Sequence, residues 1–143
     1  MKKLSLVVAT LVFISCTPIR NTNIKTNLLD NNTFELSEIS TDATYGTEKN
    51  PIQVGGVASN EGPKNERRFL NALAGPNGET VTYFRAGSCC PIESKNDPFG
   101  NGRVMLDNYR VTWEGANDTV SIYINMYDTG ILKAPKGFTI KNK

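Results

Sequence analysis

The chain has 143 residues, in which 16 lysines and arginines face 14 acidic residues, with three cysteines and no histidine. Without histidine, catalytic triads that use a histidine base and zinc sites held by histidine are excluded. The nearly balanced charge offers no basic surface for a phosphate backbone, so we expect no nucleic acid partner.

The N-terminus has the pattern of a bacterial secretory signal. Two lysines precede an apolar run over residues 4–14, which is too short to cross a bilayer as a permanent helix. The run ends in Phe13-Ile14-Ser15-Cys16, which is similar to a lipobox, in which a small residue precedes the cysteine that is lipidated. An ordinary secretory signal followed by a chance cysteine is the alternative. We expect residues 1–15 to be removed as a lipoprotein signal peptide, leaving Cys16 to hold the membrane-attaching acyl chains.

The residues after Cys16 indicate the compartment and the domain boundary. Lipoproteins that stay in the inner membrane tend to carry aspartate directly after the cysteine, whereas position 17 here is threonine, and no acidic run of the surface-exported kind follows. These features favour a lipid-anchored protein of the bacterial cell envelope, at the outer membrane and facing the periplasm. Residues 16–33, rich in asparagine and threonine, predict a lipidated N-terminus and flexible tether, and residues 34–143 predict a single β-rich domain.

The first elements of the predicted domain are a short strand in residues 50–57, "NPIQVGGV", and a helix in residues 65–75. Asn65 is the expected N-cap of this helix, and Gly75-Pro76 its end. The segment "GETVTYFRAGS", residues 78–88, predicts a strand that starts from a Gly/Pro/Asn turn.

Two segments near the C-terminus alternate apolar and polar residues and predict a β-hairpin. The first places Tyr109, Val111 and Trp113 on one face, which we expect to be buried, and residues 119–128 alternate in the same manner. A Gly/Asn/Asp turn at residues 114–118 joins them. The predicted fold class is therefore mainly β, a small antiparallel sheet or sandwich-like domain with one short helix.

The adjacent thiols of Cys89 and Cys90 are the residues with the most chemistry. Strand alternation favours two separate thiols, one pointing inward and one outward. A disulfide between them must distort the backbone, because adjacent α-carbons lie about 3.8 Å apart, below the usual disulfide range of about 4.4–6.8 Å. A metal needs further ligands, which without histidine are carboxylates or methionine. A bond to another chain is the remaining alternative.

The carboxylates give no specific catalytic pattern. Residues 97–108 fit a calcium-loop template at Asp97 but carry phenylalanine at the third position, which needs an oxygen ligand, and asparagine at the twelfth, which needs a bidentate glutamate. The pairs Glu61 with Glu66, and Asp97 with Asp107, have the spacing of ordinary surface charge. The sequence contains no phosphate-loop or dinucleotide motif. We therefore expect no catalytic residue, no cofactor and no metal.

Most of the chain from Tyr45 to Phe138 consists of five segments in a characteristic order: "YGTEKNPIQVGG", "GPKNERRFLNALAGPNGETVTYFRAGSCC", "LDNYRVTWEG", "YINMYDTG" and "APKGF". Together they resemble a group of small uncharacterised lipoproteins of Bacteroidetes-type bacteria. Members are sometimes labelled octulosonate-phosphate aldolases, yet that chemistry belongs to a (β/α)₈ barrel of about 250 residues. The resemblance implies an envelope lipoprotein and supplies no catalytic residues.

The function that these features predict is a non-enzymatic envelope module that binds another envelope protein or has a structural role. Its expected binding surface is the polar face of the hairpin with Arg110, Tyr123 and Tyr127, since arginine and aromatic side chains commonly anchor interfaces. Packing beneath a second layer is the other explanation for these three residues. The alternative function is a thiol-redox or metal-carrying protein that uses Cys89 and Cys90.

Overall fold

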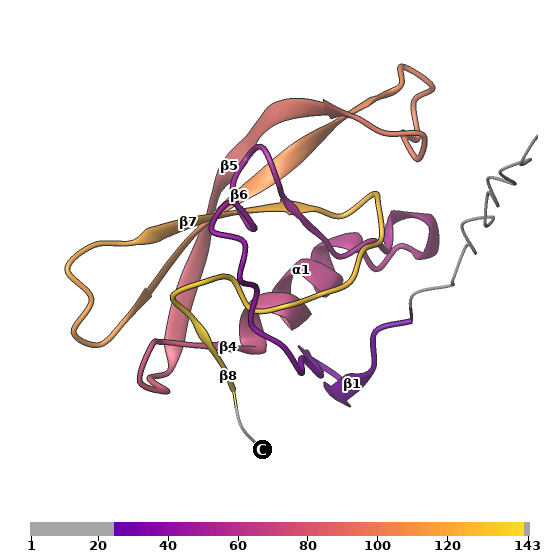
Figure 1. Ribbon diagram of the computed structural model, residues 1–143. Helices are drawn as coiled ribbons and strands as arrows, with labels where there is room; N and C mark the ends of the chain where they lie inside the picture. Colours follow the sequence, from indigo (N-terminus) through magenta and orange to yellow (C-terminus); the bar gives the residue numbers. More distant parts are fainter. Residues whose placement is uncertain (1–24, 142–143) are drawn as a thin grey trace, which may run out of the picture.

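The computed structural model describes residues 25–141 (Figure 1), and the predicted signal peptide and Cys16 lie outside them. Its centre is a four-stranded sheet with the strand order β3-β7-β6-β5. The strands are β3 (Ile52–Gln53), β5 (Val81–Glu93), β6 (Arg103–Trp113) and β7 (Val120–Asn125). β6 pairs antiparallel with both β5 and β7, whereas β3 pairs parallel with β7.

The mainly β fold class and the C-terminal hairpin are confirmed. β6 and β7 form the hairpin. Tyr109 and Val111 are two positions apart on β6, so they point to the same face, and both are buried. Trp113, the last residue of β6, packs against the core with only a minor part of its surface exposed, and it contacts Phe138 edge-on, with ring centroids 5.4 Å apart. β5 is longer than predicted, and β3 is shorter.

Two shorter sheets lie outside the central one: β1 (Leu28–Asp30) with β2 (Thr33–Phe34), and β4 (Leu73–Ala74) with β8 (Thr139–Ile140). β1 and the start of β2 fall in the segment that the sequence assigns to the tether. These strands are too short to give a periodic pattern in the sequence, and their order comes from tertiary contacts. Arg68 donates to the backbone oxygen of Asn31 at 3.0 Å, and Phe34 packs in the core. The folded domain thus begins by Leu28.

The helix α1 (Gly62–Asn71) follows the short 3₁₀ helix η1 (Val57–Ser59). It starts before the predicted cap because Pro63 lies in its first turn, where a missing backbone N–H breaks no helical hydrogen bond. Asn65 instead lies inside the helix and donates to the backbone oxygen of Gly55 at 3.2 Å. The helix also ends earlier than predicted, because the residues after Ala72 form β4.

The core lies between α1 and the sheet (Figure 1). The most deeply buried of its side chains are at most 1% exposed, and they include Phe69, Leu70, Val111, Ile122 and Ile124. Burial of these side chains from the helix and from two strands provides the main hydrophobic stabilisation of the fold.

Truncation of a core side chain tests this packing. We expect Phe69→Ala to lower the free energy of unfolding by about 3–5 kcal/mol, because it removes a fully buried aromatic ring. Phe99→Ala is the matched control, since Phe99 is exposed, and we expect it to change stability by less than about 0.5 kcal/mol. Urea denaturation measures both. Equal losses in the two variants would contradict the assignment of the core.

Candidate functional site

A polar cluster joins α1 to the sheet, and we name it the carboxyl cluster (Glu66, Arg85, Ser88, Asp107 and Tyr109). Its two carboxyl groups and Tyr109 are buried, whereas Arg85 and Ser88 are exposed. Glu66 of α1 is 0% exposed and accepts a hydrogen bond from the hydroxyl of Tyr109 at 2.9 Å. Asp107, also buried, accepts from Arg85 through Nε at 2.7 Å and through Nη2 at 2.8 Å. Ser88 donates to the same carboxylate at 2.8 Å. Such a bidentate, charge-assisted pair fixes both partners in place.

An irregularity in β5 brings two of these donors to the same carboxylate. Arg85 lies opposite Tyr109 in the ladder, whereas Gly87 lies opposite Asn108, so β5 has one extra residue between them. In a regular strand, side chains three positions apart point to opposite faces. The extra residue forms a bulge that turns Ser88 to the same face as Arg85. The bulge therefore assembles the outer part of the carboxyl cluster.

The carboxyl groups of Glu66 and Asp107 are more stable with one negative charge between them than with two. Burial, and after it the negative charge of Asp107, raise the pKa of Glu66 to about 7. The hydroxyl of Tyr109 and the charge of Arg85 act in the opposite direction. Glu66 Oε1 has no hydrogen-bond partner among the described residues, as expected of a carboxyl group that is more stable in its neutral form. Glu66 is thus a neutral acid in the core below pH 7.

The sequence did not predict this pairing of Glu66 with Asp107. It offered Glu61 with Glu66, and Asp97 with Asp107, but Glu61 binds Arg68, and Asp97 accepts backbone N–H groups in a loop. The signals that point to the pairing are positional. Glu66 precedes Phe69 and Leu70 at helical spacing, and Asp107 alternates in phase with Tyr109 and Val111, so both carboxyl groups belong to the buried faces.

A pH titration of stability tests the state of Glu66. Its folded-state pKa lies above the ordinary value of 4.5, so the folded chain holds a proton that the unfolded chain has released. The contribution of Glu66 to the free energy of unfolding is therefore fully present below pH 4.5 and falls by up to about 3 kcal/mol as the pH rises to 7. The chain has no histidine, which leaves Glu66 as the expected titrating group in this window.

We expect Glu66→Gln to remove this slope between pH 5.5 and 8, because a neutral amide of similar shape replaces the titrating acid. Urea denaturation at a series of pH values measures the effect. Glu114→Gln, in the exposed turn before β7, is the control and should keep the slope of the native chain. A slope that persists in Glu66→Gln would assign the titration to another group.

Cys89 and Cys90 form a disulfide on β5, which is the edge strand of the sheet. The preference for two separate thiols is therefore not met. A second extra residue in β5, between Cys89 and Ile92, interrupts the alternation on which that preference depended. Cys90 adopts a φ of 56°, in the left-handed region, and its sulfur lies 3.6 Å from Glu48 Oε2. Both cysteines are half-buried.

Two substitutions at position 90 distinguish the effect of the backbone bulge on thermal stability from the effect of the disulfide. We expect Cys90→Gly to melt at a higher temperature than Cys90→Ala, because a left-handed φ costs alanine about 1 kcal/mol more than glycine. This order holds if the fold, and not the sulfur bond, maintains the bulge. A higher melting temperature for Cys90→Ala would mean that the backbone relaxes once the bond is absent.

The three residues of the expected binding surface, Arg110, Tyr123 and Tyr127, do not all lie on one face of the sheet. Arg110 and Tyr123 lie on the face of the sheet opposite the core, where Arg110 donates to the hydroxyls of Thr119 and Ser121, both at 2.7 Å. Tyr127 lies beyond the end of β7, away from these two. Burial raises the pKa of Tyr127, and the negative charges of Asp107 and Glu66 act in the same direction.

Phe84 is the residue that the sequence analysis missed on this surface. It is opposite Arg110 in the β5–β6 ladder and is 60% exposed. We name this surface the outer sheet face (Phe84, Asn108, Arg110, Ser121 and Tyr123). The alternation of Phe84 with Tyr83 in "TVTYFRAGS" was visible, but it did not tell which of the two faces the solvent.

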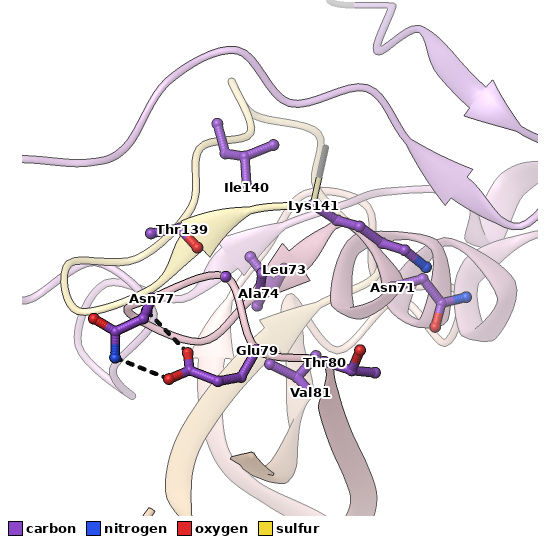
Figure 2. A pocket seen from close by; sticks show the side chains of 11 residues that line it. Asn71, Leu73, Ala74, Asn77, Glu79, Thr80, Val81, Thr139, Ile140 and Lys141 are labelled. Carbon is purple, nitrogen blue, oxygen red and sulfur yellow. Dashed lines mark hydrogen bonds between the residues drawn. The ribbon is translucent and has the colours of Figure 1, made fainter. Parts of the chain in front are cut away.

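A cavity of about 600 Å³ lies between the end of α1, the β4–β8 pair and the start of β5 (Figure 2). Lys141 extends toward Asn71 at one side of it, and Glu79 accepts two hydrogen bonds from Asn77, both at 2.9 Å. Its lining mixes these polar groups with the apolar side chains of Val81 and Ile140. None of the residues singled out from the sequence lines it.

Within residues 25–141, no three Cys, Asp or Glu side chains come together to hold a metal ion, and no helix is long and apolar enough to cross a bilayer. Comparison of the chain with protein-family models, curated proteins and solved structures finds no match. The function therefore has to be inferred from the chemistry of these surfaces.

Proposed function

We propose that this protein is a lipid-anchored, non-enzymatic module of the bacterial cell envelope, which binds another envelope protein through the outer sheet face. The observation that carries this proposal is the exposed ring of Phe84 beside Arg110, on a face whose side chains are set by strand pairing. Aromatic and arginine side chains are enriched among residues that dominate binding energy.

The rigidity of this surface supports a binding role. Arg110 is held by Thr119 and Ser121, so little side-chain entropy is lost when a partner contacts it. Phe84 and Tyr123 lie on the flanking strands, which fixes their spacing. The sheet beneath is pinned to the core by the carboxyl cluster. None of the described cavities is lined by these residues, and a preorganised face without a cavity suits a folded protein partner better than a small molecule.

The anchoring part of the proposal rests on the sequence before the described residues. The apolar run over residues 4–14 and the following Ser15-Cys16 support lipidation, and Thr17 favours the outer membrane, facing the periplasm. Attachment near the envelope partner raises the effective concentration of the outer sheet face.

Substitution of the lipidated residue tests the anchor. We expect Cys16→Ser to move the protein from the membrane fraction to the soluble fraction, because no acyl chains are attached. Fractionation of cells, with metabolic labelling by a palmitate analogue, measures this. Cys89→Ser is the matched control and should stay labelled and membrane-bound. A membrane-bound, labelled Cys16→Ser protein would contradict the assignment of the anchor.

A photo-crosslinking amino acid at position 84 tests the binding surface in cells. We expect a discrete crosslinked species when the group replaces Phe84, and at least about tenfold less of it when the group replaces Glu114 in the exposed β6–β7 turn. Equal crosslinking from both positions would contradict a specific partner at the outer sheet face.

The disulfide on an edge strand favours a second candidate function, thiol–disulfide exchange with a partner. A partner dithiol would supply two electrons, the Cys89–Cys90 bond would break to two thiols, and the partner would leave as a disulfide. Half-exposed sulfurs on β5 support such access. Thiol alkylation of the native chain, with and without a thioredoxin-type reductant, tests it. No change in alkylation with the reductant would exclude the exchange.

A further inference from the structure

The tip of the β5–β6 hairpin projects from the body of the domain (Figure 1). We name residues 94–102, between these two strands, the tip loop. Phe99 in this loop is 82% exposed, the highest value among the large apolar side chains of the described residues. Met105, on β6 just beyond the loop, is also exposed. Exposed apolar groups that share one projecting element commonly mark an interaction site.

The tip loop is built to hold Phe99 outward. Its two ends are joined by a hydrogen bond from the Ser94 N–H to the Gly102 oxygen at 3.0 Å. Inside the loop, Asp97 accepts hydrogen bonds from the backbone N–H groups of Phe99, at 2.9 Å, and of Asn101. These bonds fix the backbone on both sides of the aromatic ring, so its exposure follows from the loop geometry.

A second set of bonds ties the base of the tip loop to the domain. Asp128 accepts from the hydroxyl of Ser94 at 2.7 Å and from the amide of Asn96 at 2.8 Å. The other oxygen of Asp128 accepts from Asn125, which is fully buried at the end of β7. The loop is therefore anchored to the core while Phe99 points away from it, a preorganised arrangement that lowers the entropy lost on binding.

Two exposed cations, Lys95 and Arg103, lie on either side of Phe99 in the chain. The loop N–H groups lower the pKa of Asp97, so its carboxylate stays ionised and its charge faces the backbone of the loop. Glu93 lies opposite Arg103 in the ladder, and the two form no ion pair within the described residues. An apolar ring flanked by cations is typical of segments that enter a lipid interface.

We propose that the tip loop contacts the membrane, with Phe99 inserted among the acyl chains and with Lys95 and Arg103 at the lipid phosphates. This inference rests on the proposed lipid anchor. From Cys16 to Leu28 the chain can span about 40 Å at full extension, which keeps the domain within that distance of the bilayer. The tip loop and the first described residues lie toward the same side in Figure 1.

Quenching by brominated lipids tests the insertion on the full, lipidated protein. Purified protein carrying Phe99→Trp is incorporated into vesicles of phosphatidylcholine and phosphatidylglycerol, with or without bromine on the acyl chains. We expect the emission added by the new indole to be roughly halved by bromination, because bromine quenches only at short range. Asn117→Trp, in the exposed turn at the other end of β6, is the matched control and should lose no added emission. The native chain gives the baseline from Trp113.

The outcomes separate this proposal from the anchor. Vesicles that sediment with the protein, without quenching at position 99, would overturn the membrane contact and leave the anchor intact, and would assign Phe99 to a protein contact instead. Equal quenching in Phe99→Trp and Asn117→Trp would overturn it as well, since the orientation would then be random. Protein that fails to sediment with the vesicles would overturn both.

Discussion

The hydrogen bond from Tyr109 to Glu66, inside the carboxyl cluster, is the contact on which the arrangement of the domain depends. It joins the helix to β6, an inner strand of the sheet. The ion pair between Asp107 and Arg85 then joins β6 to the edge strand β5. A buried acid without a cation of its own is tolerated there because it remains protonated. The packing of Phe69 and Leu70 follows from the same docking of the helix on the sheet.

The cluster also accounts for the shape of β5. Arg85 and Ser88 both reach Asp107 only because a bulge intervenes between them. A second bulge at Cys89 and Cys90 follows within a few residues, and Pro91 comes next. Irregularities and proline on an edge strand prevent unwanted pairing with other chains. The adjacent cysteines, which suggest a reactive pair in the sequence, thus also form part of an irregular edge that does not pair with other chains.

Period-two alternation predicted the hairpin because β6 and β7 are long and each has one buried face, so their pattern survives in the sequence. The same reasoning predicted β5 as a strand but gave the wrong directions for its cysteine side chains, because each bulge shifts the phase and gives no local signal. It missed β1 and β2, which are short and whose order depends on a contact from Arg68. The carboxyl cluster could not be predicted from the sequence, because only the docking of the helix on the sheet brings Glu66 and Asp107 near each other.

The parallel pairing of β3 with β7 has a consequence for the order of folding. Ile52 pairs with Ile124, about 70 residues later, so this contact closes a long loop, whereas β5, β6 and β7 follow one another and pair locally. A chain that emerges from the ribosome with its N-terminus first therefore exposes β3 long before its partner strand is made. Until β7 follows, the apolar side chain of Ile52 has no sheet to join, so the complete domain can form only after nearly the whole chain has emerged.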